Sequence, residues 1–152
     1  MGKEALKMVG KDVYMLKYVE NQTPEICLEA VKQNGWALQY VEELALEICL
    51  EAVKQAGYAL QFVEEQTPKI CLEAVKQNGE VLEHVENQTP EICLAAVKQK
   101  GRALKYVKEQ TPEICLEAVK QTSNAIICVK DKSMLKDILK PEPNKSAVMS
   151  AF

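Results

Sequence analysis

Six cysteines and a single histidine are the residues of this 152-residue chain best suited to covalent or metal chemistry. Thiols in such numbers could form disulfides, bind zinc or act as nucleophiles. His84 is the only imidazole, so a nucleophile–base pair or a mixed Cys/His zinc site would have to use it. The cysteines are Cys27, Cys49, Cys71, Cys93 and Cys115, which are 22 residues apart, and Cys128.

The positions of the cysteines favour a structural role. Each repeated cysteine stands between an isoleucine and a leucine, where a free thiol behaves as a small hydrophobic side chain. Stacked helices lie about 10 Å apart, beyond the limit of about 7 Å between the Cα atoms of a disulfide. No Cys-x-x-Cys motif is present. We therefore predict buried thiols, no metal and no cofactor, with a Cys115–Cys128 bridge as the alternative.

Unpaired thiols in this number are typical of a reducing compartment. The predicted location is therefore the cytoplasm, including the cytoplasm of a host cell. The start of the sequence, Met1 to Glu4, lacks the apolar region of a signal peptide, and no apolar stretch is long enough to cross a bilayer.

The cysteine spacing reflects a 22-residue repeat that organises most of the chain. The segment TPEICLEAVKQ at 23–33 returns with few changes at Thr67, Thr89 and Thr111, and a degenerate copy starts at Leu44. We predict one domain over 1–140, followed by a tail at 141–152. Its parts are a half-repeat at 1–19, repeats at 20–41, 42–63, 64–85, 86–107 and 108–129, and a capping helix at 130–140.

Each repeat is expected to contain two short helices. Thr23 and Pro24 are typical of an N-cap and a first helical position, and apolar residues then cover about half of the helix circumference. Asn34 and Gly35 predict a left-handed C-cap before a second helix at roughly 36–42. Both helices are too short to be stable alone, so neighbouring repeats must stabilise them. The prediction is an all-α solenoid of about five helix-turn-helix repeats with half-repeat caps at both ends.

The phrase NQTPEICLEAVKQNG at 21–35 closely resembles a family of short tandem repeats catalogued as a domain of unknown function. Such arrays occur in bacterial, protist and large-DNA-virus proteins. The resemblance covers about 20–129 and implies a helical-repeat module without an established activity or catalytic residues. Residues 44–46 and 140–152 depart from the repeated pattern, so the resemblance implies nothing about them.

The repeats differ from one another mainly at the turn and in the second helix. The residue after the turn is aromatic at Tyr14, Trp36 and Tyr58, and charged at Glu80 and Arg102. Exposed aromatic side chains in a row are typical of a binding surface, and partial burial against the next turn is the alternative. The candidate partner-binding residues are Tyr14, Trp36, Gln39, Tyr58, Gln61, Glu80, Glu83, Lys100, Arg102 and Lys105.

A second column of side chains lies four residues further along, on the same face of the second helix. It holds Tyr18, Tyr40, Phe62 and Tyr106, and we predict that these rings pack between repeats. His84 occupies the same column, which argues against a catalytic role for it.

Charge changes sign along the array. Acidic residues predominate in 1–76, whereas 98–108 contains bases and no acid. A graded surface suits a protein partner of complementary charge, and a merely solvated face is the alternative. Nucleic-acid binding is disfavoured, because acids interrupt the basic columns and the net charge is −3.

The repeat at 42–63 lacks the usual helix start. Leu44, Ala45 and Leu46 replace Gln, Thr and Pro, and all three favour or tolerate a helix. We predict a continuous helix over roughly 36–55 that bends or splays the array. Leu44 and Leu46 would then need cover and are candidate self-association residues.

The C-terminal end is expected to form a capping unit. Ser133 is a candidate N-cap for a helix with Met134, Leu135, Ile138 and Leu139 on its apolar face. Phe152 at the end of the tail is a candidate anchor.

These features together favour a non-enzymatic protein–protein interaction module. A nucleophile–base pair, a Gly-rich phosphate loop and a metal-binding motif are all missing from the sequence. A specific version is an inhibitor or adaptor that acts on a host or defence protein. The alternatives are a self-assembling structural protein, which would form homo-oligomers, and a nucleic-acid-binding repeat protein.

Overall fold

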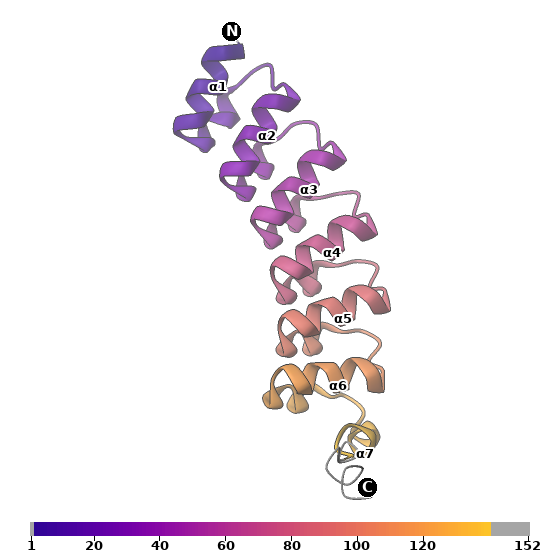
Figure 1. Cartoon of the computed structure of the whole chain (residues 1–152). Coiled ribbons are helices and arrows are strands. Elements are labelled where there is room, and N and C mark those ends of the chain that lie inside the picture. Colours follow the sequence, from indigo (N-terminus) through magenta and orange to yellow (C-terminus); the bar gives the residue numbers. More distant parts are fainter. Residues whose placement is uncertain (1, 141–152) are drawn as a thin grey trace, which may run out of the picture.

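The computed structural model describes residues 2–140, which form a gently curved stack of helices in chain order (Figure 1). Between residues 2 and 128, ten-residue α-helices alternate with six-residue 3-10 helices, and no β-strand occurs among the described residues. The all-α solenoid is confirmed. The α-helices are α1 (Gly2–Lys11), α2 (Pro24–Gln33), α3 (Leu46–Gln55), α4 (Pro68–Gln77), α5 (Pro90–Gln99), α6 (Pro112–Gln121) and the shorter α7 (Leu135–Ile138). The 3-10 helices are η1 (Val13–Tyr18), η2 (Gly35–Tyr40), η3 (Gly57–Phe62), η4 (Gly79–His84), η5 (Gly101–Tyr106), η6 (Ser123–Cys128) and η7 (Lys132–Met134).

The start of each regular α-helix is fixed by a threonine and a proline. The Thr23 hydroxyl accepts a hydrogen bond from the Ile26 N–H at 3.3 Å, and Pro24 occupies the first helical position of α2. Thr67, Thr89 and Thr111 cap α4, α5 and α6 in the same way.

The turn between the two helices differs from the expected left-handed C-cap. Asn34 is extended, with φ −153°, and no residue between 2 and 140 has a positive φ. The Asn34 side chain instead accepts a hydrogen bond from the Trp36 N–H at 3.0 Å and so caps η2. Asn34 therefore ends α2, since its N–H donates to the Ala30 carbonyl oxygen at 3.0 Å, and it also starts η2.

The second helix of each repeat is a 3-10 helix and not an α-helix. With three residues per turn, Leu38 and Val41 stack on one face, and both are buried. The Val41 N–H donates to the Leu38 carbonyl oxygen at 3.1 Å, and Val41 itself is extended, so η2 ends there. The six residues of η2 thus contribute Ala37 and Leu38 to the core, and Val41 follows directly after the helix end.

Stacking of the repeats creates one continuous core along the array. Each α-helix contacts the next α-helix, and each of η1 to η5 contacts the α-helix of the following repeat. In α2 the buried side chains are Ile26, Cys27, Ala30 and Val31, and the equivalent residues are buried in α3, α4 and α5. Stability therefore depends on contacts between repeats.

The glycine that begins η2 to η5 permits this close stacking. A Cβ atom added to Gly101 would lie 2.5 Å from the Ala118 carbonyl oxygen and 2.6 Å from Thr122 Cγ2, both in the next repeat. Since these glycines have negative φ, the requirement is for space and not for an unusual backbone conformation.

The prediction of a continuous helix over 36–55 is wrong. Val41 and Ala45 are both extended, and α3 begins at Leu46. The stack keeps its regular order here, with α3 between α2 and α4 (Figure 1). Burial of Val41, together with the linker path that the neighbouring repeats impose, overrides the helix propensity of Leu44 to Leu46.

The C-terminal end is also built differently from the expectation. Asp131, not Ser133, caps η7, because its carboxylate accepts from the Ser133 N–H at 2.9 Å. The short helix α7 follows and contacts α6, with Ile138 buried and Leu139 exposed. The predicted tail at 141–152, including Phe152, lies outside the described residues.

Candidate partner-binding surface

All ten candidate binding residues lie on η1 to η5 or at the cap that precedes η5. Consecutive 3-10 helices contact one another, so these residues form one surface along the array. Tyr14 and Trp36 are 47% and 39% exposed, whereas Tyr58 and Glu80 are half-buried. The remaining members are exposed. We call this the 3-10 surface, formed by Tyr14, Trp36, Gln39, Tyr58, Gln61, Glu80, Glu83, Lys100, Arg102 and Lys105.

The aromatic part of the 3-10 surface is built from ring pairs between repeats. Trp36 packs edge-on against Phe62 of the following repeat, with 6.0 Å between ring centroids. Tyr14 makes the same contact with Tyr40 at 6.0 Å. The rings of Tyr14 and Trp36 are therefore partly covered by rings of the following repeat. These contacts hold the two rings in place and leave part of each exposed to solvent.

His84 takes the place of an aromatic ring in the second column. Its ring lies edge-on to Tyr58, with 5.7 Å between centroids. Burial, together with the nearby carboxylates of Glu83 and Glu80, raises the pKa of the Tyr58 hydroxyl. Tyr58 is thus a neutral ring at the point where the surface changes from aromatic to charged. At the start of the column, Tyr18 is 66% exposed instead of packed between repeats.

The charged part of the surface contains one internal ion pair. Lys100 Nζ lies 3.0 Å from a carboxylate oxygen of Glu80. Lys105 Nζ lies over the Tyr106 ring, 4.6 Å from its centroid. Since Lys100 and Glu80 form an ion pair, the net positive charge at this end of the surface comes from the exposed side chains of Arg102 and Lys105.

The cysteines lie in the core. The five repeated cysteines are buried, Cys128 is half-buried, and all six are free thiols. No cluster of His, Cys, Asp and Glu that could hold a metal ion occurs between residues 2 and 140. Burial raises the pKa of the Cys27, Cys49, Cys71 and Cys93 thiols, and that of Cys115.

The raised thiol pKa values predict that stability falls in alkali. As the pH rises above 9.0, the ordinary pKa of these thiols, the unfolded chain loses protons that the folded chain keeps, so unfolding is favoured. We expect the urea midpoint, measured in reducing buffer, to fall as the pH rises from about 8 to about 10. Cys93→Ala should reduce this pH dependence. A pH dependence that is unchanged in Cys93→Ala would contradict the assignment.

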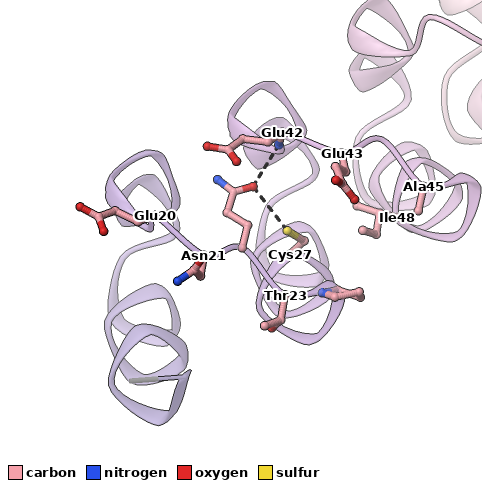
Figure 2. A pocket seen from close by; sticks show the side chains of 10 residues that line it. Glu20, Asn21, Thr23, Cys27, Glu42, Glu43, Ala45 and Ile48 are labelled. Carbon is pink, nitrogen blue, oxygen red and sulfur yellow. Dashed lines mark hydrogen bonds between the residues drawn. The ribbon is translucent and has the colours of Figure 1, made fainter.

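A glutamine in each regular linker joins three segments, and the sequence reasoning missed it. The Gln22 side-chain amide donates to the Tyr40 carbonyl oxygen at 2.7 Å and to the Leu16 carbonyl oxygen at 3.1 Å. Its oxygen accepts from the Glu42 N–H at 3.0 Å and lies 3.6 Å from Cys27 Sγ. Figure 2 shows Glu42 and Cys27, from different segments, converging on this oxygen. We call this arrangement the linker clip.

Linker clips recur at Gln66, Gln88 and Gln110. Beside the Gln22 clip is an open groove of about 300 Å³, with Glu20 and Glu43 among its lining residues (Figure 2). The signal for the clip was available in the sequence, because glutamine recurs before the Thr-Pro pair in every regular repeat.

A second glutamine joins the end of an α-helix to the preceding repeat. The Gln99 side-chain oxygen accepts from the Gly79 N–H at 2.6 Å. Gln77 and Gln121 bind the N–H groups of Gly57 and Gly101 in the same way, at 2.8 and 2.6 Å. We call these bonds the glycine clips.

Comparison with known families identifies the repeats. The sequence model of a domain of unknown function, DUF4116, matches five overlapping segments, at 5–45, 23–67, 46–89, 67–111 and 89–136. The chain belongs to the DUF4116 family. The matches together extend from residue 5 to residue 136, and each covers about two DUF4116 repeats of 22 residues. The resemblance noted in the sequence is thereby confirmed.

No curated protein and no solved structure matches this DUF4116 array. None of the helices among residues 2–140 combines the length and the apolar character needed to cross a membrane.

Proposed function

We propose that this DUF4116 array is a non-enzymatic module that binds a protein partner across the 3-10 surface. The observation that carries the proposal is the separation of variable from repeated positions. The buried residues recur almost unchanged, whereas residues that differ between repeats gather on one set of adjoining 3-10 helices. Variation among near-identical repeats confers different chemistry on each part of one surface.

The chemistry of the surface defines the kind of partner. Tyr14 and Trp36 offer partly exposed rings held by neighbouring repeats, a form of preorganisation that reduces the cost of binding. Arg102 and Lys105 offer positive charge about three repeats away. The partner therefore presents an apolar patch and an acidic patch on one elongated face. A host or defence protein inhibited or recruited by the array is the specific version we propose.

Two further features support a non-enzymatic role in a reducing compartment. His84, the only imidazole of the chain, packs on Tyr58. All six cysteines are free thiols, which is typical of cytoplasmic proteins.

Affinity capture from the native cell with matched variants tests the proposal. Trp36→Ala combined with Tyr14→Ala removes the exposed rings, and Glu25→Ala combined with Lys32→Ala alters exposed residues of α2 as the control. We expect a partner captured by the wild type and the control to be lost with the ring variant, with a drop in affinity of about tenfold or more. Equal capture of the same proteins by all three would contradict the assignment of the surface.

Self-assembly is the second candidate, and Leu46 is the observation that favours it. This side chain is 51% exposed, and Leu44 beside it is half-buried. Light scattering separates the two functions. A monomer whose mass does not change with concentration supports the binding module. A molar mass that increases with concentration, and no longer does so in Leu46→Gln, supports assembly.

A further inference from the structure

Five interfaces join successive repeats from α1 to α6, and they differ in their side-chain hydrogen bonds. We call each interface a seam and name it by its two α-helices. The α1–α2 seam has the linker clip of Gln22, and the three seams from α3 to α6 have both a linker clip and a glycine clip.

The α2–α3 seam is the only one of the five whose own linker lacks a clip glutamine and which also lacks a glycine clip. The Gln22 clip does reach this linker, at the Glu42 N–H, but no side-chain hydrogen bond joins residues 2–41 directly to residues 46–140. Leu44 stands where the other linkers have glutamine, so it cannot bond the backbone of the next linker. The Gln55 side chain, which would form the glycine clip with Gly35, donates to Glu51 at 3.1 Å instead. Ala45 also makes no side-chain cap to α3, unlike the threonines of the regular repeats.

Apart from the Gln22–Glu42 bond, the side-chain contacts that remain at this seam are apolar. Gly35 lies close against Ala52 and Ala56 of the next repeat, and Trp36 meets Phe62 edge-on at 6.0 Å. Leu44 packs against the core, but it supplies no hydrogen bond across the seam. The polar bonds present at the other four seams are directional, so they restrain rotation of one repeat against the next more than apolar contacts do.

We propose that the array opens at the α2–α3 seam before it unfolds elsewhere, so that residues 2–41 and 46–140 behave as two segments joined by a hinge. This is a conformational device produced by the degenerate repeat. If the proposed function also holds, the hinge separates Tyr14 and Trp36 from the charged part of the 3-10 surface and lets the two parts adjust to one partner. The opening itself does not depend on any partner.

The chain contains its own reporter of the opening. Trp36 is the only tryptophan, and its ring contact with Phe62 crosses the α2–α3 seam. Urea unfolding of the full chain is followed by tryptophan fluorescence and by far-UV circular dichroism. We expect the fluorescence midpoint to lie about 1 M urea below the dichroism midpoint, since the seam lacks several hydrogen bonds.

Two variants distinguish seam opening from simple fraying. Leu44→Gln restores the linker clip and should bring the two midpoints together, whereas Leu46→Gln adds the same side chain two residues away and should leave them apart. Coincident wild-type transitions would overturn the proposal. A separation that persists unchanged in Leu44→Gln would overturn it too, because fraying of the first repeats does not require the missing clip.

Discussion

Gly101→Ala is expected to destabilise the array by about 3 kcal/mol or more. The added methyl group would meet the Ala118 carbonyl oxygen at 2.5 Å and Thr122 Cγ2 at 2.6 Å. The carbonyl belongs to the backbone of α6 and cannot rotate away, so α6 would have to move from η5. That movement would also break the hydrogen bond that the N–H of residue 101 donates to the Gln121 side-chain oxygen.

Gly10→Ala is the matched control. Gly10 lies within α1, and the nearest atom to its added Cβ is Gln33 Nε2 at 4.0 Å. Alanine there should stabilise the helix by about 0.5–1 kcal/mol, since glycine is the poorer helix former. Urea midpoints measure both changes. Equal effects of the two substitutions would show that helix propensity, not contact between repeats, determines the role of Gly101.

Gln88→Leu should cost about 2–3 kcal/mol of stability. The Gln88 amide donates to the Tyr106 and Leu82 carbonyl oxygens at 2.9 and 3.3 Å, and its oxygen accepts from the Lys108 N–H at 3.0 Å. Leucine has a similar volume, so the substitution removes the bonds while leaving the space filled. The natural Leu44 shows that the fold accommodates leucine at the equivalent position.

Gln39→Leu provides the comparison for this prediction. The Gln39 side chain is exposed and donates only to the Trp36 carbonyl oxygen of its own helix, at 3.1 Å. Its replacement should change the free energy of unfolding by less than about 0.5 kcal/mol. A Gln88→Leu chain as stable as the Gln39→Leu chain would contradict the role of the linker clip.

The repeat itself could be predicted from the sequence because its signals are local. Thr23 and Pro24 mark the beginning of α2, and the position of Cys27 between Ile26 and Leu28 indicates burial. Local signals also placed the variable residues in the second helix of each repeat. These inferences needed no knowledge of how the repeats meet.

The predictions that failed depend on contacts between repeats. Asn34 and Gly35 were expected to form a left-handed C-cap. Asn34 does end α2, but in an extended conformation with its side chain capping η2, and Gly35 packs closely against the next repeat with a negative φ. The helix propensity of Leu44 to Leu46 is overridden by the linker path. Gln22 reaches segments up to 20 residues away, and such pairings cannot be inferred from a helical period.

The helicity of a single isolated repeat tests the central claim most directly. A peptide of residues 86–107, with blocked ends, contains α5, η5 and the capping residues Thr89 and Lys100, but none of the neighbours that form the seams. If stacking supplies the stability, its far-UV circular dichroism in water should be that of a largely unfolded chain. A peptide with the helix content of α5 and η5 in the intact array would show that each repeat is stable by itself.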